Sequence, residues 1–370
     1  RRHSRRDTNL RDQKINLNNI MDLSVLIFLL GGLFLGWSLG ANDAANVFGT
    51  AVGTSMVRFQ TAAIVCSVFV IIGAVISGSG TTETLGKLGS INALPGAFSA
   101  SIAAGLSVYL MTKLGVPVST TQAIVGAIIG WNIYTGSSTN LKVLLTIIST
   151  WFICPVISAL LAMFFFKLTK LLLNKSNIHL LRLDAYTRTA LLLAGAFGAY
   201  SLGANNIANV MGVYVPISPF TEINFFKLFT LSSSGQLFLI GGIAIAVGVF
   251  TYSKRVMITI GDDLLKLTPV AAFIVVVTHS IVLFAFASKG LSNFLVSLNI
   301  PPIPLVPVSS SQAIVGAVLG IGLLKGGKEV RWNIASKIVL GWITSPLIAL
   351  LLSMIILFVL QNIFNQIVSV

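Results

Sequence analysis

The sequence predicts an all-α, polytopic membrane protein built from two related halves. Hydrophobic residues make up 55% of its 370 residues and charged residues only 9%, whereas about 25% of the residues in a typical soluble domain are charged. The apolar residues form long continuous runs without the alternation of a β-barrel, and in lipid such runs fold as helices because every backbone amide needs an internal partner. A long sequence pattern also occurs twice, which indicates a duplication.

The apolar runs give five membrane-entering elements in each half. In the first half they cover residues 23–39, 61–77, 97–114, 118–134 and 141–166. In the second half they cover residues 190–202, 235–250, 269–287, 308–324 and 334–360. The fourth run of each half lies next to a Pro-Val-Ser sequence, which is a helix start signal. An odd number of crossings per half would invert one half relative to the other.

Two pairs of motifs keep the same order in both halves. Residues 38–52 (SLGANDAANVFGTAV) return as residues 201–215 (SLGANNIANVMGVYV), and residues 116–127 (VPVSTTQAIVGA) return as residues 306–317 (VPVSSSQAIVGA). Polar motifs inside duplicated apolar segments are typical of secondary transporters, in which repeats and broken helices surround a midplane site. We therefore expect two inverted-topology repeats with broken helices and re-entrant helical hairpins.

The repeats give the expected domain boundaries. We predict a basic N-terminal tail over residues 1–20, a first transmembrane repeat over 21–173, a connecting loop over 174–188 and a second transmembrane repeat over 189–370. The two motif pairs are offset by 163 and 190 residues, so the second half has gained 27 residues between its motifs. Part of this insertion is the segment 288–304, whose prolines disfavour a continuous helix.

The net charge of +14 reflects membrane topology and predicts no nucleic-acid partner. The basic residues gather beside apolar spans, in the tail and in a polar mid-chain stretch. An odd number of crossings between these two clusters would place them on opposite faces, so the sequence leaves the orientation open, and it does not decide whether the tail is native. The clusters consist of Arg1, Arg2, Arg5, Arg6, Arg11 and Lys14, and of Lys167, Lys170, Lys175, Arg182 and Arg188.

The first motif combines a predicted helix break with an acid in an apolar segment. Glycines and side chains that compete with the backbone for hydrogen bonds weaken the helix near residues 40–42, and a break there gives a cation site beside an anion site. Asp43 is the only acid in such a setting, where a carboxylate costs about 2.5 to 3.5 kcal/mol. Its natural partner is a small hard cation such as sodium, with Asn42 completing the shell. The alternative is that Asp43 caps a helix and the asparagines join helices.

The second motif of each half predicts an oxyanion site. Ser119 and Ser309 are candidate helix N-caps, and each is followed by two further hydroxyl residues and a glutamine. The hydroxyls and unpaired amides of two helix starts, one from each half, could face one tetrahedral anion from opposite sides. The alternative is ordinary capping of two short helices.

Charge arithmetic links the two sites. Against a membrane potential of about 100 mV, inside negative, entry of a divalent phosphate costs about 4.6 kcal/mol, and each entering sodium ion returns about 2.3 kcal/mol. At least two sodium ions per divalent anion are therefore needed to cancel the electrical cost. Only the first motif copy supplies a carboxylate.

Other polar residues are weaker candidates. Segment 80–87 departs from a phosphate-binding loop pattern and is interpreted as a plain loop, in which Glu83 is a candidate for gating or cation binding. His279 is either a proton carrier or, as the favoured interpretation, an interhelical hydrogen-bonding residue. Cys66 and Cys154 predict neither a disulfide framework nor a zinc site. No constellation of nucleophile and base indicates an enzyme, and no cofactor is expected besides sodium as the coupling ion.

The motifs resemble the signatures of the inorganic phosphate transporter (PiT) family. GANDAANV (residues 40–47) and GANNIANV (residues 203–210) are similar to the family's GANDVANA-like motif, and PVSTTQ and PVSSSQ resemble its PVSTTH-type helix starts. The resemblance covers nearly the whole chain beyond the tail. It implies cation-coupled import of inorganic phosphate across the cell (plasma) membrane by a multi-pass protein, with substrate and sodium held between inverted repeats.

Carried over by position, the resemblance supplies a candidate site. Its phosphate-binding residues are Asn46, Ser119, Thr120, Thr121, Gln122, Asn209, Ser309, Ser310, Ser311 and Gln312. Its sodium-binding residues are Asn42, Asp43, Asn205 and Asn206. Many family members have aspartate where this chain has Asn206, which bears on the number of sodium sites and on the coupling ion.

The leading hypothesis is a secondary active symporter that imports phosphate with sodium, both bound at the midplane between the repeats. A sulfate permease or a proton-coupled phosphate permease of the same fold is the nearest alternative. A passive anion channel and a membrane receptor or structural protein are alternatives from other classes. A homodimer is left open by the sequence.

Overall fold

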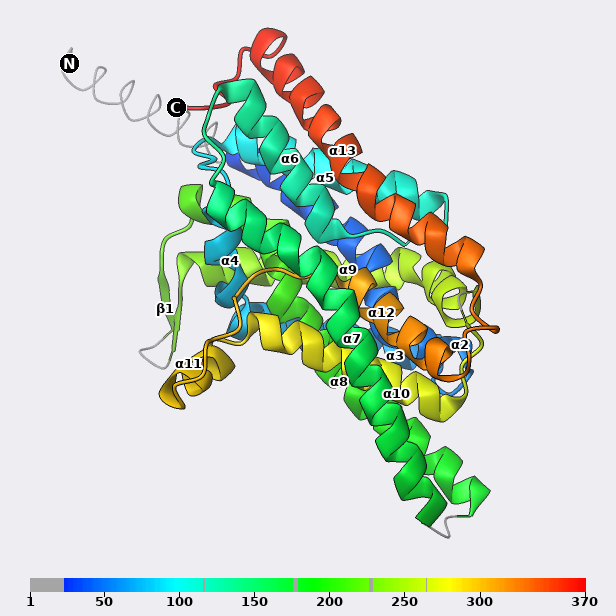
Figure 1. Cartoon of the computed structure of the whole chain (residues 1–370). Helices are drawn as coiled ribbons and strands as arrows, with labels where there is room; N and C mark the ends of the chain where they lie inside the picture. Colours follow the sequence, from blue (N-terminus) through cyan, green and yellow to red (C-terminus); the bar gives the residue numbers. More distant parts are fainter. Residues whose placement is uncertain (1–22, 116, 176–178, 226–228, 264) are drawn as a thin grey trace, which may run out of the picture.

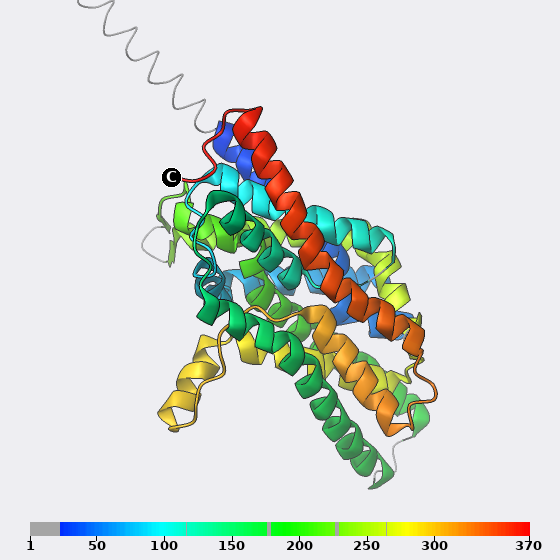
Figure 2. The same ribbon diagram turned by 45° about the horizontal axis from the view of Figure 1, so that its top comes forward.

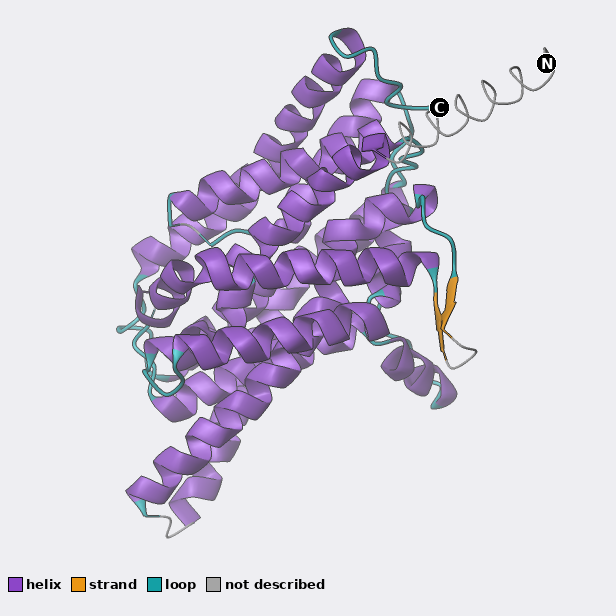
Figure 3. Cartoon of the chain, turned by 180° about the vertical axis from the view of Figure 1, so that it is seen from behind, coloured by secondary structure: helices purple, strands orange, loops and turns teal. Residues whose placement is uncertain are grey.

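Helices make up almost all of the computed structural model (Figure 1). The structure describes residues 23–115, 117–175, 179–225, 229–263 and 265–370. In this part of the chain the strands form one small antiparallel pair, β1 (Ile223–Phe225) and β2 (Phe229–Leu231), at the edge of the bundle (Figure 3). The predicted all-α class is confirmed.

The first half begins with a helix over residues 23–42, which continues after a single turn residue. Its further helices are α2 (Ala44–Gly53), α3 (Phe59–Ser77), α4 (Ser79–Gly86), α5 (Leu94–Lys113), α6 (Thr120–Thr135) and α7 (Leu141–Lys175). The second half follows the same plan with two additions. Its helices are α8 (Leu180–Met211), the 3₁₀ helix η1 (Gly212–Ile217), α9 (Ser233–Asp263), α10 (Pro269–Ala287), α11 (Lys289–Ser297), α12 (Ser310–Leu324) and α13 (Trp332–Asn362).

Within the described residues, 7 helices are long and apolar enough to cross a membrane. Their apolar side chains point outward as well as inward: α7 and α13, for example, expose leucine, isoleucine and phenylalanine along much of their length. In water such surfaces would aggregate, whereas lipid solvates them. The protein is therefore a multi-pass membrane protein, as predicted.

Helices from one half pack mainly on helices from the other. Helix α3 lies against α8 and α2 lies against α9, while α6 lies against α13 and α12 lies against α7. Figure 2 shows the last pairs, with α13 along α6 and α12 beside α7. Each pairing has a counterpart with the halves exchanged. This is the packing that two repeats related by a two-fold axis produce, and their inverted orientation stays a prediction.

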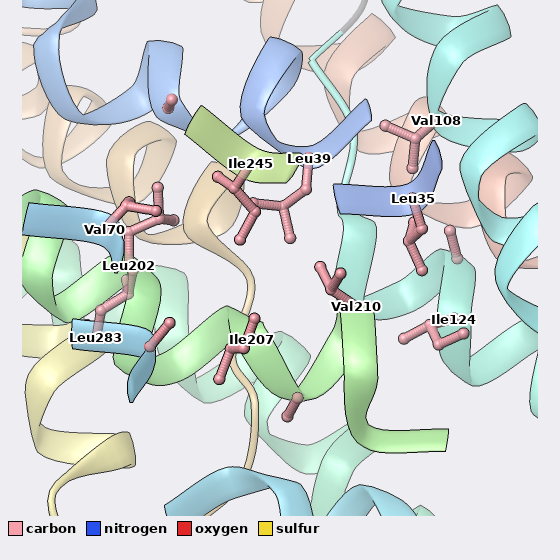
Figure 4. Close-up of a cluster of buried hydrophobic side chains, with 14 of the residues drawn as sticks. Leu35, Leu39, Val70, Val108, Ile124, Leu202, Ile207, Val210, Ile245 and Leu283 are labelled. Carbon is pink, nitrogen blue, oxygen red and sulfur yellow. The ribbon is translucent and has the colours of Figure 1, made fainter. Parts of the chain in front are cut away.

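Glycines at matching positions allow these helix pairs to touch through their backbones. A Cβ atom on Gly40 would collide with the carbonyl oxygen of Ile245, and one on Gly203 would collide with that of Val70. The neighbouring core repeats the same exchange, with Leu39 beside Ile245 and Leu202 beside Val70 (Figure 4). The glycines of the first motif pair therefore serve close helix packing.

The second motif pair has the same relation. A Cβ atom on Gly126 of α6 would collide with the carbonyl oxygen of Pro346 in α13, and one on Gly316 of α12 would collide with that of Pro155 in α7. A proline inside a helix leaves a carbonyl without its usual partner, and glycine allows the facing backbone to approach this kink. Helices α6 and α12 are thereby packed closely against the last helix of the opposite half, α13 and α7 respectively.

Two predicted loops are wrong in the structure. Residues 80–87 lie largely within α4, where Thr82 donates a 2.8 Å hydrogen bond to the carbonyl of Gly78 and Glu83 pairs with Lys87 one turn on. The connecting loop over 174–188 is much shorter, because α7 continues to Lys175 and α8 already begins at Leu180. The stretch contains no glycine or proline, and its leucines, arginines and alanine favour a helix, so polarity here does not mark a long break.

The helix break predicted near residues 40–42 is limited to one turn residue, Asp43, and the second motif has no break. In the first motif the interruption is at Asp43, whose amide bonds to Leu39 at 2.6 Å while its carbonyl accepts from the amide of Asn46 at 3.0 Å, a locally tightened turn. In the second motif α8 is continuous as far as Met211. Its asparagines find partners on other elements, so they do not compete for the backbone of their own helix.

Candidate functional site

The four motifs meet in the interior of the bundle. Asn46 of α2 donates a 3.0 Å hydrogen bond to the hydroxyl of Ser310 at the start of α12. Asn209 of α8 donates a 2.9 Å hydrogen bond to the hydroxyl of Thr121 at the start of α6. Each asparagine motif thus contacts the hydroxyl motif of the opposite half. All fourteen predicted site residues have relative exposures of 3% or less.

The two hydroxyl motifs form helix N-termini of the same geometry. Ser119 precedes α6 and Ser309 precedes α12, and each accepts a 3.2 Å hydrogen bond from the backbone amide of the glutamine three residues later, Gln122 or Gln312. The capping interpretation therefore accounts for one hydroxyl in each motif. The next two hydroxyls and the remaining amides of the first turn lie at the positive end of the helix dipole, which favours an anion.

The remaining hydroxyls contact the asparagine motifs and one another. Thr121 Oγ1 lies 3.3 Å from the carbonyl oxygen of Val308 and 3.5 Å from Asn206 Oδ1. Ser311 Oγ lies 3.0 Å from Ser309 Oγ and accepts a 3.2 Å hydrogen bond from the indole of Trp342. The start of α6 and the segment just before α12 are therefore joined by the contact between Thr121 and Val308.

Asp43 is the one acid among the residues whose burial is described that is withdrawn from solvent, at 2% exposure. It precedes α2, but its side chain makes no capping hydrogen bond, which is contrary to the capping alternative. Thr120 faces its carboxylate. Neither Thr120 Oγ1 nor Asp43 Oδ1 has a hydrogen-bond partner within the described part of the chain. A buried carboxylate in this state is stabilised by a cation.

Several other buried acceptor oxygens share this property. A buried polar atom without a partner costs about 1–3 kcal/mol, so a set of them in one region indicates a ligand. Carbonyl-type oxygens are the ligands that hard cations prefer. In the described residues, the unpartnered amide oxygens of the motifs are those of Asn42, Asn46, Gln122, Asn209 and Gln312.

The asparagines of the second motif are engaged differently from those of the first. Asn205 donates to the carbonyl of Leu283 in α10 at 3.2 Å and accepts from the amide of Val308 at 2.9 Å, so it ties the second hairpin to α8. Asn42, its counterpart, has no partner for either amide atom among the described residues. Asn206 Oδ1 accepts from Asn209 at 2.9 Å. The predicted sodium ligands thus divide into engaged and unengaged side chains.

Three further residues contact the site, of which His279 was a weaker candidate, favoured as an interhelical hydrogen-bonding residue, and the other two were not predicted as site residues. His279 of α10 lies 2.8 Å from the hydroxyl of Ser310 through its Nε2 atom. Thr81 of α4 donates to the backbone carbonyl of Asn205 at 3.0 Å. Trp342 reaches Ser311 from α13, and its repeated Trp-x-x-x-Pro setting at residues 151–155 and 342–346 was a signal in the sequence.

No group of three or more histidine, cysteine, aspartate or glutamate side chains that could hold a metal occurs in the described part of the chain. Apart from the carboxylate of Asp43, the unpartnered side-chain oxygens of the motifs are amide and hydroxyl oxygens, which fit a weakly bound monovalent cation better than a transition metal. A transported ion needs such a site, because it has to leave again.

Comparison with known proteins places these features in a family. A sequence model of the phosphate transporter family matches residues 39–183, 179–353 and 296–369, which together include all four motifs. A protein of Methanocaldococcus jannaschii is 29% identical over 336 residues, covering 91% of this chain and 98% of that protein. One of Haemophilus influenzae is 26% identical over 429 residues, covering 92% and 97%. Both carry provisional names as phosphate permeases.

The fold has a counterpart among solved structures. A structure described as the sodium-dependent phosphate transporter superposes with a TM-score of 0.72 at 23% sequence identity, covering 92% of this chain and 99% of that chain. This similarity concerns the fold alone. The family match confirms the predicted resemblance and makes the protein a transporter and not an enzyme. The chain belongs to the phosphate transporter family.

Proposed function

We propose that the protein imports inorganic phosphate together with sodium ions, both bound where the four motifs meet. The observation that carries the proposal is the pairing of two helix N-termini, one from each half, with buried acceptor oxygens and one buried carboxylate. Hydrogen-bond donors gather at the starts of α6 and α12, and the carboxylate of Asp43 faces Thr120 at the first of these starts. An anion at the helix starts and a cation at Asp43 would each stabilise the binding of the other.

The anion is held by donors. Thr120, Thr121, Ser310 and Ser311 follow the capping serines, and the amide groups of Asn46 and Asn209 reach into the same region. Hydroxyls and first-turn amides bind the oxygens of a tetrahedral anion without any basic side chain. No lysine or arginine is among the buried residues in the described part of the chain, so the positive charge for anion binding has to come from the cation, which is what coupling requires.

The unpartnered oxygens favour phosphate over sulfate. Monohydrogen phosphate carries a proton that it can donate, whereas sulfate only accepts hydrogen bonds at neutral pH. The side-chain oxygens of Gln122 and Gln312 are acceptors without a partner in the described residues, and they lie in the first turns that would hold the anion. A site built to accept a hydrogen bond discriminates strongly against a ligand that has none to give.

Sodium supplies the positive charge. The carboxylate of Asp43 and the amide oxygens of Asn42 and Asn46 are the ligands we assign to it. Two sodium ions offset the electrical cost of one divalent phosphate, about 4.6 kcal/mol at 100 mV. Asn206 stands where many relatives have aspartate, so a second ion would rely on neutral oxygens or on the phosphate itself.

The test is uptake of labelled phosphate by liposomes that contain the purified protein. We expect accumulation above the external concentration under an inward sodium gradient, little accumulation under a potassium gradient, and no competition from excess sulfate. Empty liposomes and liposomes with the gradient collapsed are the controls. Uptake driven equally by potassium or by a proton gradient would reassign the coupling ion, and equilibration without accumulation would indicate a channel.

A further inference from the structure

His279 is a fully buried histidine at the edge of the site. It lies in α10, has 0% exposure, and its Nε2 atom is 2.8 Å from the hydroxyl oxygen of Ser310, the first residue of α12. Its other ring nitrogen, Nδ1, has no hydrogen-bond partner within the described residues. A packing histidine would normally have both nitrogens satisfied, so this one is held for a single contact.

The contact falls on a hydroxyl that is already engaged. Ser310 Oγ also accepts a 3.0 Å hydrogen bond from Asn46 of α2. A serine hydroxyl has one proton to donate and two lone pairs to accept with. If Nε2 carries the histidine proton, both lone pairs of Ser310 are filled by neighbours, and its own proton is left free to donate to a third group.

The first half lacks this arrangement. Thr120 stands at the position that corresponds to Ser310, and its hydroxyl has no hydrogen-bond partner in the described chain. It faces Asp43, and the preceding helix α5 contains no histidine. The two helix starts therefore differ, with a carboxylate beside one hydroxyl and an imidazole beside the other. The duplication therefore does not explain His279, whereas a role at the start of α12 does.

We propose that His279 is a positioning residue for the anion: its Nε2–H donates to Ser310, and together with Asn46 it commits the Ser310 hydroxyl to donating toward phosphate. The inference rests on the proposed function of the same site and adds a selectivity device to it. A hydroxyl locked as a donor favours a fully ionised acceptor oxygen of the anion at this position, while the acceptors elsewhere in the site receive the phosphate proton.

The test uses four variants and two measurements. His279→Leu removes the donor at similar volume, His279→Gln keeps an N–H group of similar reach, and Ser310→Ala and the double variant form a cycle with His279→Leu. The measurements are the KM of sodium-driven phosphate uptake and the phosphate concentration that half-maximally raises the melting temperature of the detergent-solubilised protein in sodium.

We expect His279→Leu to weaken phosphate binding by about tenfold, the loss of roughly one oriented hydrogen bond. His279→Gln should recover most of this loss. Adding His279→Leu to Ser310→Ala should change binding no further, because the histidine acts through that hydroxyl. Wild-type affinity in His279→Leu, additive losses in the double variant, or failure of glutamine to rescue would each overturn the inference.

Folding and function are separated by the design. Should His279→Leu fail to fold, His279→Asn replaces it, because asparagine is too short to reach Ser310 while glutamine is not. A wild-type protein that binds phosphate but shows no sodium-driven uptake would overturn the proposed function, and the thermal measurement would still decide the role of His279. A wild-type protein that binds no phosphate would overturn both.

Discussion

At the scale of single residues, Asp43 is the most consequential side chain of the site. A carboxylate at this depth costs about 2.5 to 3.5 kcal/mol unless a cation accompanies it. We expect Asp43→Asn to abolish sodium-dependent phosphate uptake while the protein stays at least as stable in sodium-free detergent, because a buried charge has been removed. Uptake assays and thermal unfolding with and without sodium measure the two effects. Normal sodium dependence in this variant would remove Asp43 from the cation site.

Asn205 and Asn42 occupy matching positions but should respond differently to truncation. Asn205→Ala leaves the carbonyl of Leu283 and the amide of Val308 without their partner, which costs about 1–3 kcal/mol for each group, so the melting temperature should fall. Asn42→Ala removes two atoms that have no partner among the described residues. In sodium-free detergent it should be neutral, whereas the stabilisation that sodium gives the wild type should be lost.

Equal destabilisation by the two variants, with sodium stabilisation intact in both, would contradict the division into engaged and unengaged asparagines. A matched reference is Asn140→Ala. Asn140 accepts from the amide of Val143 at an exposed helix start outside all four motifs, so its loss should leave the sodium response unchanged.

Glu83 illustrates an exposed pair that contributes little to folding. A 2.7 Å hydrogen bond and the charge of Lys87 lower the pKa of Glu83 below its ordinary value, and the charge of Lys289 acts in the same direction. A lowered pKa stabilises the folded state above the unfolded pKa, and that stabilisation is lost as the pH falls through the folded pKa. Both partners are more than half exposed, so the effect is small.

We therefore expect Glu83→Gln to change the free energy of unfolding at neutral pH by less than about 1 kcal/mol, so the melting temperature should stay close to that of the wild type. Thermal unfolding at neutral and at acidic pH checks this, and the small difference between wild type and variant should shrink in acid. A large loss at neutral pH would mean that the α4 region depends on this pair. Lys87→Met provides the matched removal of the other partner.

At the scale of elements, glycine contacts determine how the hairpin helices sit. A Cβ atom at Gly316 would collide with the backbone of Pro155, and overpacking of this kind costs about 1–3 kcal/mol. Gly316→Ala should lower the melting temperature, whereas Gly86→Ala, at a helix end with open space around it, should be neutral or slightly stabilising. Equal effects at both positions would show that α12 and α7 separate without penalty.

Elements were predictable where apolar runs or start signals defined them. The Pro-Val-Ser starts of α6 and α12 and the proline-rich segment before Ser310, which has no regular secondary structure, are as expected. The continuity of α8 through its glycines and asparagines was not, because it depends on partners such as Leu283 and Val308 that only the tertiary structure supplies. An asparagine side chain weakens its helix only if it hydrogen-bonds to the backbone of that helix, and the sequence does not show whether it will find a partner on another helix instead.

The residue types of the site were predictable from the sequence, and the hydrogen bonds between them were less so. Repetition marked the asparagines and hydroxyls, and the structure brings Asn46 to Ser310 and Asn209 to Thr121. Which residues then form contacts depends on which helices become neighbours. This applies to the contacts between opposite halves, to the hydrogen bond that Asn205 accepts from Val308, and to the contact of His279 with Ser310. A single polar residue in an apolar run carries no signal of what it will face.

At the scale of the whole molecule, the basic residues within the described part of the chain predict an orientation. The end of α7, the start of α8, the facing ends of α9 and α10, and the connection between α12 and α13 lie at the end of the bundle away from the C-terminus (Figure 1). The described residues at or near this end include Lys167, Lys170, Lys175, Arg182, Arg188, Lys266, Lys325, Lys328 and Arg331. The positive-inside rule therefore predicts that this end faces the cytoplasm. The basic tail over residues 1–20 lies outside the described residues.

Cysteine labelling in intact cells tests this orientation. Lys175→Cys and Asn299→Cys place thiols at exposed positions of opposite ends, and the native Cys66 and Cys154 are buried. We expect a membrane-impermeant maleimide to label Asn299→Cys from outside and Lys175→Cys only after the cells are opened. The reverse pattern would invert the topology, and labelling of the unsubstituted protein would show that a native thiol is reachable.

The backbone contact between α12 and α7 couples the binding site to the far end of α7. The first turn of α12 supplies half of the proposed anion site, and Gly316 and Gly320 of the same helix pack directly against the backbone of Pro155 and Ala159 in α7. We therefore expect a displacement of that first turn to move α7 with it. Since Lys175 lies 20 residues beyond Pro155, about 30 Å along the helix, a small rotation about Pro155 becomes a larger displacement at Lys175. The opening of the binding site would thus be readable at the membrane surface.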